Sequence, residues 1–72
     1  MKLTEGLNNT VYTVSGMNLP LKIEKRLETL GMVQGTKLTL LNKKDSALVV
    51  VIRGARFALG QEIARNIDVK IS

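Results

Sequence analysis

The stretch "RLETLGMVQGTK", residues Arg26–Lys37, decides how the chain is laid out. Before its first glycine, Ile23, Leu27 and Leu30 recur at helical spacing, which predicts an amphipathic helix from about Pro20 to Leu30. Proline suits the first position of that helix, because the N–H that it lacks would have no helical partner there. The stretch therefore begins in a helix.

The two glycines of the stretch predict a helix end followed by a tight turn. Gly31 fits the left-handed position that closes many helices, and Met32 would then fold back onto Leu27. In Val33–Thr36, Gly35 is third of four, where a type II turn needs a positive φ. A strand is expected to start directly after this turn.

Gly31–Lys37 also has the look of a phosphate-binding loop, and that alternative fails on three counts. Three residues separate the glycines instead of four, and Thr36 precedes Lys37 where the motif has lysine first. The motif also needs a strand before the loop and a helix after it, the reverse of the order predicted here. The stretch does not predict a nucleotide site.

Five short segments read as strands. The first is "TVYTV", with Ser15 and Gly16 ending it; "TKLTLL" and "ALVVVI" then form a hairpin across the polar loop "NKKDS", and Arg53-Gly54 ends or kinks the latter strand. "RFAL" follows, "GQEIARNI" reads as a helical turn, and "IDVKI" closes the chain with Ile67, Val69 and Ile71 on one face. Connections this short argue for one small antiparallel β-barrel domain over residues 1–72, without exposed edges.

Composition narrows the functional classes. The 72 residues include 11 Lys and Arg against 6 Asp and Glu, giving a net charge of +5, which favours acidic partners. There is no cysteine and no histidine, so the usual nitrogen and sulfur ligands of Fe²⁺ or Zn²⁺ are missing. The opening "MKLTEGLNNT" lacks the apolar run of a signal peptide, and no segment reaches membrane-spanning length. We expect a cytoplasmic protein.

Two longer stretches, "KIEKRLETLGMVQGTKLTLL" and "VVVIRGARFALGQEIARNIDV", resemble the ferrous-iron transport protein A (FeoA) family. The resemblance rests on ordered anchors that span nearly the whole chain: Arg26-Leu27, Leu30-Gly31, Gly35, Arg53-Gly54, Ala58-Leu59 and Ile67. It implies an SH3-like β-barrel with a helix after the first strand and a short helical turn before the last. It also implies a cytoplasmic role beside the GTPase-coupled transporter, ferrous-iron transport protein B. Related domains are appended to metal-dependent repressors.

The residues themselves argue against a metal site or an enzyme. Glu24 and Glu28, four apart on the helix, could touch one cation, but a solvated helix face explains them better. We expect no cofactor and no metal bound by the monomer. Without histidine or cysteine the commonest general base and the strongest nucleophile are absent. Arg53 or Arg56 could serve a partner GTPase as an arginine finger, although ordinary exposed arginines account for both.

A docking surface is the remaining hypothesis. If Leu48, Val50 and Ile52 face the core, Val49 and Val51 point outward. Either a helix covers this apolar stripe, or the stripe contacts the transporter's cytoplasmic domain or a second copy of the chain. The candidate partner-binding residues are Val49, Val51, Arg53, Arg56, Lys43 and Lys44.

Nucleic-acid binding is the alternative function, since small basic barrels often perform it. Against it, Tyr12 and Phe57 are the only aromatic residues, and single-strand binders need several rings for stacking.

Overall fold

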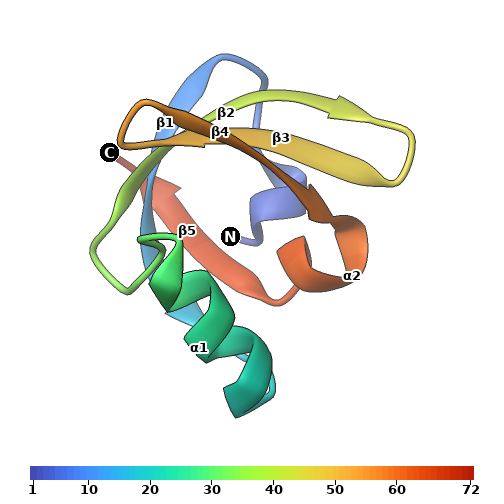
Figure 1. The fold of residues 1–72 in the computed structure, drawn as a ribbon. Coiled ribbons are helices and arrows are strands. Elements are labelled where there is room, and N and C mark those ends of the chain that lie inside the picture. The colour runs from blue at the N-terminus through green and yellow to red at the C-terminus, as the bar shows by residue number, and fades with distance from the viewer.

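In the computed structural model, which describes residues 1–72, five antiparallel strands form one curled sheet, with two short helices below it (Figure 1). The elements in chain order are the 3₁₀ helix η1 (Leu3–Glu5), β1 (Thr10–Met17), α1 (Leu21–Thr29), β2 (Lys37–Lys44), β3 (Ala47–Ile52), β4 (Ala55–Gly60), α2 (Gln61–Ala64) and β5 (Ile67–Ile71). The predicted SH3-like architecture is confirmed, with a helix after the first strand and a helical turn before the last. Neither helix is long and apolar enough to cross a membrane.

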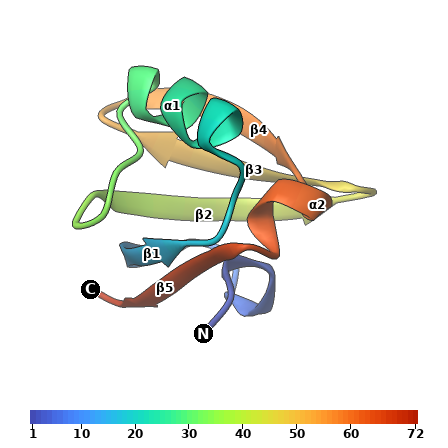
Figure 2. The same cartoon turned by 90° about the horizontal axis from the view of Figure 1, so that it is seen from below.

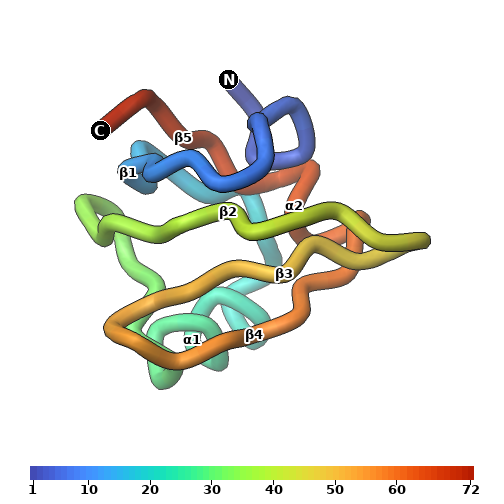
Figure 3. The backbone as a smooth tube through the Cα atoms, turned by 90° about the horizontal axis from the view of Figure 1, so that it is seen from above, coloured from blue at the N-terminus to red at the C-terminus, as the bar shows by residue number.

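The sheet is open, and the prediction of a closed barrel without edges is wrong in this respect. The strand order is β4-β3-β2-β1-β5, which Figure 3 shows from above, and β4 does not pair with β5. The outer edge of β5 is taken by the N-terminal residues instead. Met1 and Val69 exchange backbone hydrogen bonds of 3.1 and 2.7 Å, and Lys2 forms a bridge with Asp68. Figure 2 shows the N-terminus beside β5.

The end of α1 has the predicted Schellman geometry. Gly31 has φ +97°, and its N–H donates to the carbonyl of Glu28 at 2.9 Å. The N–H of Met32 donates to the carbonyl of Leu27 at 2.9 Å, and both side chains are buried in the core. Pro20 is the residue before the helix rather than its first residue, with ψ 144°. Glycine suits the helix end because the residue there has to adopt the left-handed backbone conformation.

The turn after the helix is also as predicted, and its hydrogen bonds exclude a phosphate loop. Gly35 has φ +93°, and the N–H of Thr36 donates to the carbonyl of Val33 at 3.0 Å. The N–H of Gly35 donates to the carbonyl of Val14 at 2.8 Å. Because the amides of both glycines already donate to backbone carbonyls, they are not free to bind an anion.

Side chains from every strand and from α1 build the core, and no polar side chain is buried. The alternation predicted for β2 and β3 is confirmed. Ile71 was expected to share the face of Ile67 and Val69, but unlike them it is 75% exposed. It is the last residue of β5 and lies beyond the N-terminal residues that cover Val69. The buried residues are Leu3, Tyr12, Val14, Leu27, Met32, Leu38, Leu40, Leu48, Val50, Ile52, Leu59, Ala64, Ile67 and Val69.

Two strands are longer than predicted because each contains a β-bulge. β1 continues through Ser15 and Gly16 to Met17, with a register shift between Val14 and Gly16. β2 continues through the residues predicted as a loop to Lys44, with a shift after Leu40, so that only Asp45 and Ser46 connect it to β3. A bulge adds one residue and breaks the alternation of apolar and polar residues. The part of the strand beyond the bulge therefore cannot be predicted from that alternation.

Arg53 and Gly54 end β3, as predicted, in a two-residue turn. Both have positive φ, 53° and 82°, as a type I′ hairpin turn requires. Arginine is unusual in that conformation. A Cβ placed on Gly31 would lie 3.7 Å from Cδ and Nε of Arg53, so the arginine packs beside the carboxyl end of α1, where the helix carbonyls carry partial negative charge.

Candidate functional site

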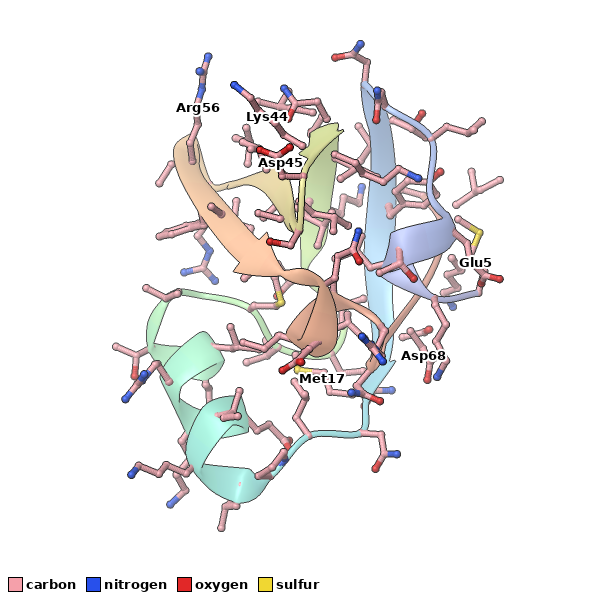
Figure 4. The ribbon with its side chains drawn as sticks, turned by 90° about the vertical axis from the view of Figure 1, so that its right-hand side faces the viewer. Glu5, Met17, Lys44, Asp45, Arg56 and Asp68 are labelled. Atoms are coloured by element: carbon pink, nitrogen blue, oxygen red, sulfur yellow. The ribbon has the colours of Figure 1, made fainter.

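The six predicted docking residues do not form one cluster. Lys44 pairs with Ala47 and Arg56 pairs with Val51, four residues further along β3, which separates their backbones by about 13 Å along the strand. Figure 4 shows the side chain of Arg56 pointing away from the body of the protein. Lys44 lies at the tip of the β2–β3 hairpin, so the two cations belong to opposite ends of the sheet.

Lys43 and Arg53 have other contacts. Lys43 pairs with the buried Leu48, so it points to the inner side of the hairpin, where its Nζ donates to the carbonyl of Thr4 at 3.1 Å. Arg53 packs beside Gly31. Each of these side chains therefore already contacts another part of the protein.

Val49 and Val51 point outward from β3, as the strand period requires, and both are half-buried. No helix covers them: α1 packs its inner residues Ile23 and Leu27 against the core, and Figures 1 and 4 both show it below the sheet. Their partial cover comes from neighbours on the adjacent strands. Val49 pairs with Ala58, and Val51 pairs with Thr39 and Arg56.

The register extends this stripe into a wider surface. Arg56, Val51, Thr39 and Val11 form one row across four strands, in which Val11 is 44% exposed. A second row joins Lys37, Thr13 and Lys70. Residues paired in this way have Cβ atoms about 5 Å apart on the same side of a sheet. We call this surface the outer face: Val11, Thr13, Lys37, Thr39, Lys44, Val49, Val51, Arg56, Ala58 and Lys70.

The outer face is basic because it carries four cations, Lys37, Lys44, Arg56 and Lys70, whereas the strands hold one carboxylate, Asp68. Oδ1 of Asp68 lies 2.9 Å from Nζ of Lys2, which offsets its charge. The outer face therefore combines apolar side chains with a surplus of positive charge.

Sequence reasoning missed half of this surface. The alternation of "TKLTLL" already predicted that Lys37 and Thr39 share a side of their strand. Val11, Thr13 and Lys70 join them only through the pairing of β1 with β2 and β5, whose register the sequence does not reveal, and the pairing with β5 also contains a bulge.

The two helix carboxylates considered as metal ligands line a shallow pocket. Glu24 and Glu28 lie beside Met17 and Met32 in a depression of about 240 Å³, whose other lining residues are Gly16, Val33 and Gln34. No three histidine, cysteine, aspartate or glutamate side chains come together anywhere in the structure. Two carboxylates on an exposed helix hold a divalent ion poorly. Tight binding needs either six or more oxygen ligands or a set of nitrogen and sulfur ligands.

Comparison with solved structures places the fold among two groups of proteins. The FeoA protein from Chlorobium tepidum superposes with a TM-score of 0.92 at 27% identity, over 99% of this chain and 70% of that one. Iron(II) transport protein A from Clostridium thermocellum gives 0.88 at 19% identity, over 99% of this chain and 45% of that one. The repressor ScaR, solved with bound Zn²⁺, gives 0.90 at 22% identity, and the chain spans only 37% of its length.

Sequence comparison gives the family. No curated protein matches the chain. The model of the FeoA domain matches residues 1–71, which is nearly the whole sequence. That match agrees with the open SH3-like sheet and with the anchors at Gly31, Gly35 and Arg53-Gly54, and the chain belongs to the FeoA domain family.

Proposed function

We propose that this chain is a small cytoplasmic regulator of ferrous iron transport that acts by protein contact. The partner is the cytoplasmic domain of the GTPase-coupled iron transporter, ferrous-iron transport protein B. Membership of the FeoA family links the chain to ferrous iron transport. The observation that carries the proposal is the outer face, where half-buried valines and surplus positive charge lie together without a covering helix. Apolar surface rimmed by charge is typical of interaction sites.

We propose no catalytic role and no resident metal for the chain itself. The support is chemical: neither histidine nor cysteine is present, and the two helix carboxylates beside the pocket have no third ligand near them. The ferrous ion is then the cargo of the transporter. This domain would act on the transporter without holding the ion.

Nucleic-acid binding has less support. Tyr12 is 2% exposed and Phe57 is half-buried against the core, so the protein lacks the several exposed rings on which bases stack. The charge of the outer face is then the only feature in favour of this function. A chain that does not bind single-stranded RNA at about 50 mM salt, where electrostatic attraction is strong, has no such function.

The function is tested by capturing the transporter's cytoplasmic domain on immobilised protein, with the variant Val51→Glu. A carboxylate in the centre of the apolar row should lower capture by roughly tenfold, as expected for the loss of about 1.4 kcal/mol of binding free energy. The thermal midpoint should change little. The control is Val33→Glu, the same substitution at an exposed valine in the turn before β2.

Two results would count against the proposal. Unchanged capture by Val51→Glu would place the contact elsewhere. A large fall in the thermal midpoint would show that Val51 belongs to the core and that its outward face has no separate role.

A further inference from the structure

β4 is the one strand of the sheet that has a neighbour on a single side. It pairs with β3 along its whole length, from Ala55 to Gly60, and no other strand lies beyond it. The other edge strand, β5, is covered by the N-terminal residues. Figure 3 shows β4 as the outermost strand of the sheet.

The hydrogen-bonding phase of the β3–β4 hairpin shows which groups of β4 face outward. The N–H of Gln61 donates to the carbonyl of Ser46 at 2.9 Å, just beyond the pair of Ala47 with Gly60. In an antiparallel pair, bonded and non-bonded positions alternate. The backbone groups of Ala55, Phe57 and Leu59 therefore face β3, and those of Arg56 and Ala58 face away from it.

The outward-facing groups of Arg56 and Ala58 have no partner in the protein. None of the hydrogen bonds outside the ladders, and none of those made by side chains, involves either residue. Both residues are exposed. Two N–H and two C=O groups thus form a ready template for one more strand, which natural proteins usually block.

Charge and side-chain direction indicate what kind of strand fits. The hairpin from Ala47 to Gly60 contains Arg53 and Arg56 and no acidic residue. On an added strand, the residue opposite Arg56 would lie on the outer face within about 5 Å, which favours a carboxylate. The residue opposite Phe57 would point inward beside that half-buried ring, which favours an apolar side chain. A second copy of this chain, with its net charge of +5, is a poorer match.

We propose that the free edge of β4 binds an extended protein segment in which acidic and apolar residues alternate, by adding it to the sheet as a sixth strand. The backbone groups of Arg56 and Ala58 hold the segment, and the side chains of Arg56 and Phe57 select its sequence. The inference rests on the proposed function in one respect only, that the partner is a protein.

The test uses the whole chain, labelled with ¹⁵N, and a capped synthetic peptide in which glutamate alternates with valine. We expect saturable binding that slows hydrogen exchange of the Arg56 and Ala58 amides by at least about tenfold, because both become hydrogen-bonded. The Phe57 amide, which is already bonded to β3, should keep its rate. The same peptide with N-methyl groups along one edge should not bind, because it cannot complete the ladder.

Two substitutions sharpen the test. Arg56→Glu should weaken binding by roughly tenfold or more, whereas Lys22→Glu, a charge reversal at an exposed residue of α1, should leave it unchanged. Ala58→Pro removes an outward N–H that the fold does not use, so the variant should fold normally and lose binding. Normal folding is checked by its far-ultraviolet circular dichroism.

Several outcomes would overturn the inference. These are no binding, equal binding of a peptide that alternates lysine with valine, equal binding of the N-methylated peptide, or chemical-shift changes confined to outer-face residues other than Arg56 and Ala58. Slow exchange of Arg56 and Ala58 in the free protein, together with a dimeric mass in sedimentation, would show a second copy on the edge instead. Because the transporter is absent from this experiment, its failure is separate from failure of the capture experiment.

Discussion

Gly6 is the position at which the structure predicts the sharpest effect of one added methyl group. Its backbone, with φ −71° and ψ 161°, suits any residue, so conformational strain is not involved. A Cβ there would lie 2.9 Å from Cε2 of Tyr12, 3.0 Å from Cδ2 of Leu40 and 3.2 Å from the carbonyl oxygen of Leu3. The ring cannot move aside freely, because its hydroxyl accepts a hydrogen bond of 2.8 Å from the N–H of Leu7.

The cost of Gly6→Ala follows from this crowding. Overpacking a well-filled core typically destabilises a protein by about 1–3 kcal/mol. In a domain of this size each kcal/mol lowers the thermal midpoint by about 4–8 °C, so we expect a fall of roughly 5–20 °C. Thermal and urea unfolding followed by circular dichroism measure both quantities.

Two comparisons isolate the cause. Gly16→Ala, whose added Cβ would meet nothing nearer than Oδ2 of Asp68 at 4.0 Å, should keep or slightly raise the midpoint. Replacing Leu40 by valine removes one of the crowding carbons, so Gly6→Ala should cost less in that background by about 0.5 kcal/mol or more. If Gly6→Ala and Gly16→Ala behave alike, or if the cost is the same in both backgrounds, the crowding around Gly6 is not what limits this site.

Two further predictions concern the helix end and the N-terminal bridge. Gly31→Ala should lower the free energy of unfolding by about 1–2 kcal/mol, because alanine is strained at φ +97° although the space around it is open, with the nearest atoms at 3.7 Å; Gly31→Asn should lose less in the same urea titration, and equal losses would point to a packing effect. Asp68→Asn should cost less than about 1 kcal/mol, since the paired side chains are 46% and 42% exposed, and the difference should shrink in high salt. A cost that persists in high salt would contradict the ion-pair explanation.

The parts of the fold that local chemistry determines could be predicted from the sequence. Gly31 and Gly35 have the positive φ values that the helix end and the type II turn require, and the N–H of Met32 donates to the carbonyl of Leu27 as the Schellman pattern predicts. The alternation around Leu38, and again around Val50, gave the inward side of two strands correctly. In each case a few neighbouring residues settle the conformation.

The parts that depend on distant pairing could not be predicted. The bulges at Ser15 and Leu41 leave no pattern in a single sequence, so the ends of β1 and β2 and the direction of Lys43 were missed. The pairing of Met1 with Val69 joins residues at opposite ends of the chain, and it occupies the edge that a closed barrel would have used for β4. The outer face was incomplete for the same reason, because Lys37 and Lys70 meet only through Thr13.

The pairing of Met1 with Val69 makes the chain suitable for circular permutation. Because Met1 lies next to Val69, and Ser72 follows three residues later, the two termini are separated by roughly 10 Å along β5. A short glycine linker could join them, and new ends could be opened between Asp45 and Ser46 at the exposed hairpin tip, where insertions and cuts are best tolerated. Such a circular permutant would keep every strand neighbour while changing the order of synthesis.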